Sequence, residues 1–148
     1  MPRMMNDAAF RAYAIACSIL AFKMLAAAIL TAATRTRVKQ FLNPEDARTL
    51  GGTGVKEEHP DVLRMLRLHR NDLENILPFF IVGLFYLMTH PSMLAAEIYG
   101  IGYLVVRTLH SVFYIRSMQP HRTIAFTLGS VLTLAMLVQT LVVVLRAG

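Results

Sequence analysis

Apolar residues gather in four stretches along the chain, and polar residues separate these stretches. The first stretch, 12–33, contains one charged residue, Lys23, and the last, 123–145, contains none. A helix rises about 1.5 Å per residue, so about 20 residues cross the ~30 Å hydrocarbon core of a bilayer. Both stretches are long enough, and they predict membrane-spanning helices over about 10–33 and 122–146.

The second stretch is too short to cross a membrane by itself. Its uninterrupted apolar part, 76–89, gives only about 21 Å of helix, whereas a bilayer core needs ~30 Å. We therefore expect the helix to extend backwards through polar residues, with a span over about 66–89. The polar residues drawn to the membrane boundary in this way are Arg67, Arg70, Asn71 and Glu74.

The third stretch, 93–116, carries ionisable groups inside its apolar sequence. Glu97, Arg107 and His110 are expensive in lipid, and such residues usually face a bundle interior or a polar cavity. The four stretches together predict an all-α protein, an integral membrane four-helix bundle that forms a single domain over residues 1–148.

The positions of lysine and arginine predict how the helices cross the membrane. Most of these residues lie in or beside the long polar segment 34–62 and the short connection 117–121, whereas the connection 90–92 has none. The positive-inside rule then places the long loop in the cytoplasm and both termini on the opposite side. We expect the endoplasmic reticulum membrane in a eukaryote and the inner membrane in a bacterium.

Composition supports a membrane protein and excludes several other classes. Hydrophobic residues make up 55% of the chain and charged residues only 16%, where a soluble domain carries about 25%. The net charge of +6 does not indicate a nucleic-acid partner, because the basic residues do not alternate with aromatic residues in one stretch. With Cys17 as the single cysteine and the histidines scattered, we expect neither an internal disulfide nor a metal site.

Polar residues recur at helical spacing on three of the expected helices, so each set shares one face. The three sets are Arg67, Arg70, Asn71 and Glu74; Arg107, His110 and Tyr114; and Arg122 and Phe126. If these faces converge at one depth, they line a cavity for an anionic ligand. Each set also has a purely structural interpretation: an ion pair between Arg70 and Glu74 on a solvated helix end, or a buried bundle histidine at His110.

Four sequence segments resemble the MAPEG family, the membrane-associated proteins of eicosanoid and glutathione metabolism. They are FLNPEDA at 41–47, RLHRNDLENILPF at 67–79, RTLHSVFY at 107–114 and HRTIAFTLG at 121–129. The likeness is greatest to the branch that holds microsomal glutathione transferase and microsomal prostaglandin E synthase. The resemblance implies a homotrimer that binds glutathione between neighbouring subunits, on the cytoplasmic side of the membrane.

The resemblance also implies roles for individual residues. Arg122 matches an arginine that holds the glutathione sulfur as a thiolate, with Thr123 as a hydrogen-bond donor, and Asp46 matches an aspartate implicated in catalysis. Arg35 matches a residue that reaches glutathione from the adjacent subunit. Together with the polar stripes, the resemblance gives a glutathione-binding set of Arg35, Arg67, Arg70, Asn71, Glu74, His110, Tyr114, Arg122 and Phe126.

These residues predict a glutathione transferase and peroxidase that acts on lipophilic electrophiles or lipid hydroperoxides. Two alternatives stay open: a prostaglandin E synthase-type isomerase of endoperoxides, and a non-catalytic lipid-binding scaffold. Thr123 stands where the synthase branch has serine, and Phe126 stands where it has tyrosine, which weighs mildly against the isomerase. Ala47 stands where the transferase branch carries a reactive cysteine, so activation through such a cysteine is not expected.

Overall fold

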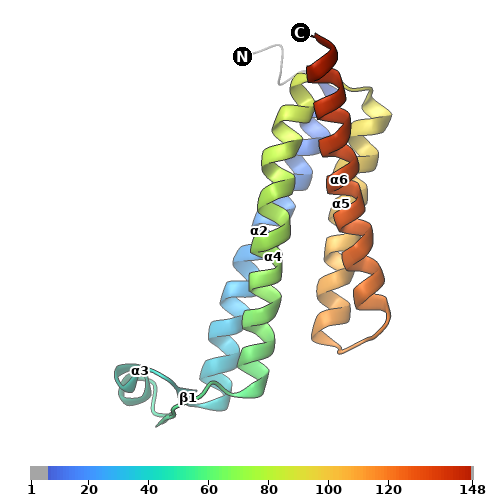
Figure 1. Cartoon of the computed structure of the whole chain (residues 1–148). Helices are drawn as coiled ribbons and strands as arrows, with labels where there is room; N and C mark the ends of the chain where they lie inside the picture. The colour runs from blue at the N-terminus through green and yellow to red at the C-terminus, as the bar shows by residue number, and fades with distance from the viewer. Residues whose placement is uncertain (1–6, 148) are drawn as a thin grey trace. The chain divides into compact units, whose positions relative to one another are not determined.

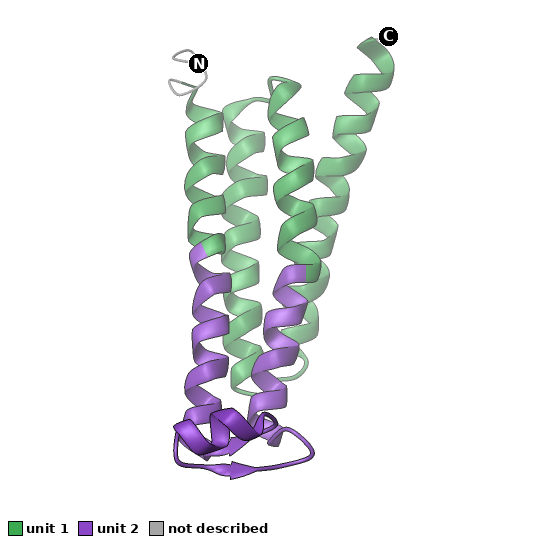
Figure 2. Cartoon of the chain, turned by 90° about the vertical axis from the view of Figure 1, so that its left-hand side faces the viewer, with its two compact units in different colours: residues 1–21, 74–148 green, residues 22–73 purple. Residues whose placement is uncertain are grey.

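A computed structural model describes residues 7–147, and long helices dominate them (Figure 1). The elements are α2 (Ala8–Val38), β1 (Gln40–Phe41), α3 (Pro44–Thr49), β2 (Thr53–Gly54), α4 (Pro60–Met88), α5 (Met93–Ile115) and α6 (His121–Ala147). The chain divides into two compact units, one of residues 1–21 and 74–148 and the other of residues 22–73 (Figure 2). We call them the larger and the smaller unit, and α2 and α4 contribute to both.

Each of the four long helices overlaps one predicted span. The bounds of α5 and α6 agree within one residue, whereas α2 ends five residues later and α4 begins six residues earlier than expected. Within the described residues, α2, α5 and α6 are long and apolar enough to cross a membrane. The predicted class, an all-α membrane protein, is therefore confirmed. Helix α4 is not among these three, because Arg64, Arg67, Arg70 and their acidic neighbours occupy its first half. Its crossing stays a prediction.

The segment predicted as a loop at 34–62 is more ordered than its composition suggests. Helix α2 continues to Val38, since no glycine or proline interrupts it and Arg35 and Arg37 in its last turn favour the negative end of the helix dipole. It ends where Lys39 takes a left-handed conformation, with φ 53°. The short strands β1 and β2 then pair in parallel, and α3 lies between them in the sequence.

Glycine is required at position 52, where the chain passes close to Phe41 of β1. A Cβ on Gly52 would lie 2.4 Å from the ring of Phe41 and 2.6 Å from the carbonyl oxygen of Lys39. Phe41 itself is buried, so its ring has little room to move away. The chain therefore has no room for a side chain at Gly52, where it passes Phe41 and Lys39.

Two ion pairs hold α2 to the chain around α4 in the smaller unit. Lys23 Nζ lies 2.5 Å from Oδ2 of Asp72, whose side chain is fully buried. Nearer the loop, Arg35 pairs with Glu58, which lies two residues before the start of α4. A charge removed from water needs a partner of opposite sign, so Lys23, the single charge of the first apolar stretch, serves here as the counter-ion of Asp72.

The larger unit has an aromatic core around Phe79 of α4. The ring of Phe79 stacks on Tyr103 of α5, with centroids 3.9 Å apart and planes at 4°, and lies 5.9 Å from the ring of Tyr13 of α2. Both Phe79 and Tyr103 are almost fully buried. Aromatic stacking of this kind adds to the burial of apolar surface.

Both tyrosines also donate hydrogen bonds to the backbone of α4 on either side of Pro78. Tyr103 Oη donates to the carbonyl oxygen of Asn75 at 2.7 Å, and Tyr13 Oη donates to that of Phe80. A proline inside a helix lacks the N–H that would bond the carbonyl one turn earlier. These phenol donors therefore join α2 and α5 to the backbone of α4 on both sides of the proline.

Gly83 gives the first stability prediction. A Cβ at this position would lie 2.2 Å from the ring of Tyr13, so Gly83→Ala must displace that ring and its hydrogen bond. We expect a loss of about 1–3 kcal/mol in the free energy of unfolding, which thermal unfolding in detergent would detect.

The matched control is Gly102→Ala in α5. There the new Cβ would meet only a methyl carbon of Leu132, at an ordinary 3.7 Å. Because alanine favours the helix over glycine by about 1 kcal/mol, this variant is expected to be neutral or more stable. Equal destabilisation by both substitutions would contradict the packing role of Gly83.

Candidate functional site

Four of the predicted site residues come together on the hairpin of α5 and α6, in the larger unit. The ring of His110 lies 5.7 Å from that of Tyr114 and 6.2 Å from that of Phe126, between centroids. The guanidinium carbon of Arg122 lies 4.8 Å from the centroid of the Tyr114 ring. Each helix contributes two residues one turn apart, so the spacing read from the sequence brings these side chains to one end of the hairpin.

The electrostatics of this cluster favour an anion. His110 is buried, Tyr114 and Arg122 are half-buried, and Phe126 is exposed. Arg122 lies in the first turn of α6, where the helix dipole adds partial positive charge. The face of the Tyr114 ring attracts the guanidinium as a cation–π contact and does not cancel its net charge.

Gln119 is a site residue that the sequence analysis missed. Its terminal amide lies 3.2 Å from Nε and 2.6 Å from Nη2 of Arg122 on one side, and 3.0 Å from Oγ1 of Thr123 on the other. A guanidinium only donates hydrogen bonds, so the amide oxygen must face Arg122 and the amide NH2 must face Thr123. The signal was present as the spacing of three and four residues from Gln119 to Arg122 and Thr123.

The other polar stripe lies on α4. Arg67 and Arg70 are exposed and Asn71 is half-buried in the smaller unit, while Glu74, one turn after Arg70, is exposed at the start of the larger unit. The helical spacing predicted for these four residues is therefore present. Their convergence with the α5–α6 cluster stays a prediction.

Arg35 and Asp46 both contact neighbours in their own unit. Arg35 pairs with Glu58, so a ligand that reached Arg35 would have to share it with this carboxylate. Asp46 lies in the first turn of α3, is half-buried, and accepts a hydrogen bond from Nδ2 of Asn43 at 3.0 Å. The Asn-Pro-Glu-Asp sequence thus forms a local turn around the start of α3, and the catalytic role of Asp46 stays a prediction.

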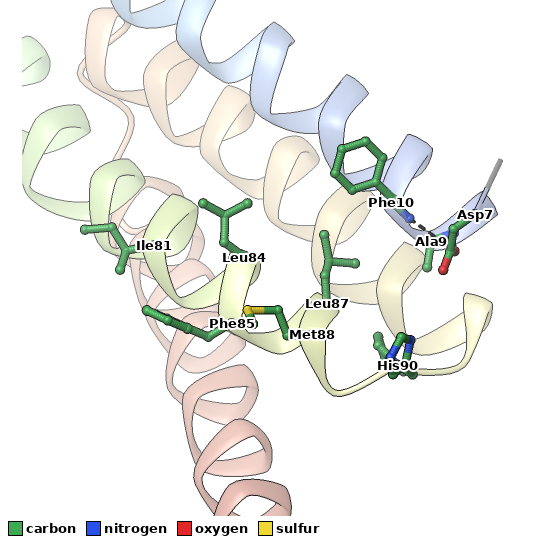
Figure 3. Close-up of a pocket in the computed structure, with 10 residues that line it drawn as sticks. Asp7, Ala9, Phe10, Ile81, Leu84, Phe85, Leu87, Met88 and His90 are labelled. Carbon is green, nitrogen blue, oxygen red and sulfur yellow. Dashed lines mark hydrogen bonds between the residues drawn. The ribbon is translucent and has the colours of Figure 1, made fainter. Parts of the chain in front are cut away.

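A cavity lies elsewhere in the larger unit, where α2 begins and α4 ends (Figure 3). Its volume is about 590 Å³, and its lining is mostly apolar, with Phe10, Leu84 and Phe85 among the side chains that surround it. Its one carboxylate, on Asp7, accepts a hydrogen bond from the backbone N–H of Ala9 at 2.8 Å. None of the predicted site residues lines it.

The described residues contain no group of three or more histidine, cysteine or acidic side chains placed to hold a metal ion. The cluster on the α5–α6 hairpin offers instead the guanidinium of Arg122, which lies beside the amide of Gln119 and the ring of Tyr114. Such a site stabilises a single negative charge.

Comparison with known proteins agrees with these observations. The model of the MAPEG family matches residues 13–142. The chain is 37% identical over 138 residues to prostaglandin E synthase of Homo sapiens, covering 93% of this chain and 91% of that protein. The rat enzyme of that name, from Rattus norvegicus, is 38% identical over 139 residues, with the same coverage. Microsomal glutathione S-transferase 1 of Sus scrofa is 35% identical over 141 residues, covering 92% of this chain and 91% of that protein.

Proposed function

Because the chain belongs to the MAPEG family, we propose that it is a membrane-bound enzyme that converts glutathione to its thiolate for attack on lipophilic electrophiles. The observation that carries this proposal is Arg122. Its guanidinium is half-buried, rests on the ring of Tyr114 and lies beside a neutral amide, so its charge is available to an incoming anion.

The chemistry needs only a stabilised sulfur anion and an apolar approach. A free thiol has a pKa of about 8.5, so only a few per cent of it is thiolate at neutral pH. A guanidinium close to the sulfur in a partly desolvated site lowers that pKa by about one to three units. In conjugation the thiolate forms a carbon–sulfur bond as a halide leaves, and in peroxide reduction two glutathione molecules supply the two electrons.

The remaining polar residues suit the rest of glutathione. The two carboxylates of the tripeptide pair with arginines, for which Arg67 and Arg70 are the candidates on α4, and its α-ammonium pairs with Glu74. Asn71, His110 and Tyr114 offer hydrogen bonds to its peptide groups, and Phe126 offers a ring face. We further propose a homotrimer, in which Arg35 of the adjacent subunit reaches the ligand on the cytoplasmic side.

A second candidate is a glutathione-dependent isomerase of prostaglandin endoperoxides. The relatives named prostaglandin E synthase favour it. Against it, Phe126 lacks the phenol hydroxyl, and the added methyl of Thr123 restricts rotation of its hydroxyl. These two residues lead us to rank the transferase activity first.

Calorimetry with glutathione, followed by a substrate panel, tests the proposal. The purified protein in detergent should bind glutathione and conjugate it to a halo-dinitrobenzene, with slower turnover of a prostaglandin endoperoxide. Faster turnover of the endoperoxide would assign the isomerase activity instead. No binding of glutathione at millimolar concentration would leave the lipid-binding scaffold as the function.

A further inference from the structure

Gln119 occupies an unusual position between the two residues proposed to act on the sulfur. It lies in the turn between α5 and α6, two residues before α6 begins at His121. Its side-chain amide lies over the first turn of α6 and contacts both Arg122 and Thr123. No other described side chain is shown to touch these two residues together.

The oxygen of Gln119 determines where the guanidinium of Arg122 points. It accepts from two nitrogens of Arg122, Nε and Nη2, at 3.2 and 2.6 Å. A flexible arginine held by two hydrogen bonds and by the Tyr114 ring has few alternative rotamers left to populate. Fixing the charge before the ligand arrives lowers the cost of organising the site.

The neutrality of Gln119 is as important as its contacts. The ion pairs shown within the described residues involve Lys23, Arg35, Arg37 and His59, and none of them involves Arg122. A carboxylate in the place of the Gln119 amide would keep the contact with Arg122 but cancel its charge, and it would have no hydrogen to donate to Thr123. Glutamine therefore supplies orientation without neutralisation.

The NH2 group of Gln119 acts on Thr123 in a complementary way. A hydroxyl has one donor hydrogen and two acceptor lone pairs, and the Gln119 NH2 occupies a lone pair of Thr123 Oγ1 at 3.0 Å. The hydroxyl hydrogen is then free to donate to a second acceptor, such as a sulfur anion. One amide thus sets the direction of two donors.

We propose that Gln119 is the positioning residue of the sulfur site, which presents the undiminished charge of Arg122 and the hydroxyl hydrogen of Thr123 to the same anion. This inference rests on the proposed function. It predicts that Gln119 governs ionisation of the bound thiol and has little effect on the affinity for the peptide part of glutathione.

The test is a pH titration of the ultraviolet thiolate absorbance of bound glutathione in the full-length protein. Gln119→Glu should raise the midpoint by about one unit or more, because the new carboxylate offsets the guanidinium. Gln119→Met keeps the side-chain length without the polar atoms, and it should raise the midpoint by about half a unit, an approximately threefold loss of thiolate at neutral pH. Glutathione affinity by calorimetry, measured at a pH well below the titration midpoint so that the thiol stays protonated, should change less than twofold in both variants.

Met118→Glu is the matched control, since it adds the same charge one residue away on an exposed side chain of the same turn. Solvent and salt screen such a charge, so the midpoint should stay within about 0.2 units of the wild type. An equal shift in Met118→Glu and Gln119→Glu would overturn the inference, and so would unchanged midpoints in both Gln119 variants. If Gln119→Glu does not fold, Gln119→Met alone decides. Absence of thiolate in the wild-type protein would instead reject the proposed function.

Discussion

Replacing Arg122 with leucine is expected to abolish the thiolate absorbance that appears when glutathione binds. Leucine keeps an apolar side chain near the Tyr114 ring and removes the charge that stabilises the sulfur anion. If the guanidinium lowers the thiol pKa by one to three units, conjugation at neutral pH should fall about tenfold or more. Stopped-flow ultraviolet spectra and steady-state rates with a halo-dinitrobenzene measure the two effects.

Arg116→Leu is the control for this substitution. Arg116 is an exposed residue at the C-terminal end of α5. Its backbone N–H donates to the carbonyl oxygens of Tyr114 and Val112, and within the described residues no side-chain contact shown in the structure joins it to His110, Tyr114, Arg122 or Phe126. Arg116→Leu removes the same charge from the same end of the α5–α6 hairpin. Thiolate formation should be retained in this variant. Full thiolate absorbance in Arg122→Leu would refute the assignment of the sulfur site to Arg122.

The second large effect is expected at the ion pair of the smaller unit. Lys23→Met removes the ion pair with the fully buried carboxylate of Asp72. Removal of one partner from a buried ion pair typically lowers the free energy of unfolding by about 3–5 kcal/mol, because the remaining charge is shielded from water. We therefore expect a large fall in the unfolding temperature in detergent, with conversion to an aggregated form at physiological temperature.

A double-variant cycle separates this ion pair from simple side-chain packing. Lys23→Met combined with Asp72→Leu should recover most of the lost stability, since apolar residues can replace a buried pair at little cost. The exposed pair of Arg37 and Asp61, at 3.5 Å, provides the comparison within the same unit. Arg37→Met should cost less than about 1 kcal/mol, as is usual for surface pairs. Additive losses in the Lys23 cycle would contradict the coupling.

The sequence predicted the helices well because lipid imposes a simple rule on length and polarity. The limits expected for the third and fourth spans differ from those of α5 and α6 by at most one residue at any end. The same helical spacing placed His110 beside Tyr114 and brought Arg122 and Phe126 to the same end of the hairpin. These features depend on local periodicity, which a single sequence reveals.

Features that depend on contacts across the chain could not be predicted in the same way. The partner of Lys23 is forty-nine residues away at Asp72, and nothing in the spacing of either residue indicates the other. The parallel pairing of β1 with β2 and the close approach of Gly52 to Phe41 likewise join separate parts of one segment, which local spacing does not indicate. Gln119 lies in the connection before α6, where helical periodicity does not identify a shared face, so its contacts with Arg122 and Thr123 were not predicted.

The cluster on the α5–α6 hairpin has a consequence for how such an enzyme can change. His110, Tyr114, Gln119, Arg122 and Phe126 lie within one short stretch of sequence and one compact unit. Arg67, Arg70 and Asn71 belong to the other unit. In the proposed roles, substitutions of Gln119 and Arg122 alter the reactivity of the sulfur, and substitutions of Arg67 and Arg70 alter retention of the tripeptide. The reactivity of the sulfur and the affinity for the tripeptide can therefore change separately, and directed evolution can select for one while the other is kept.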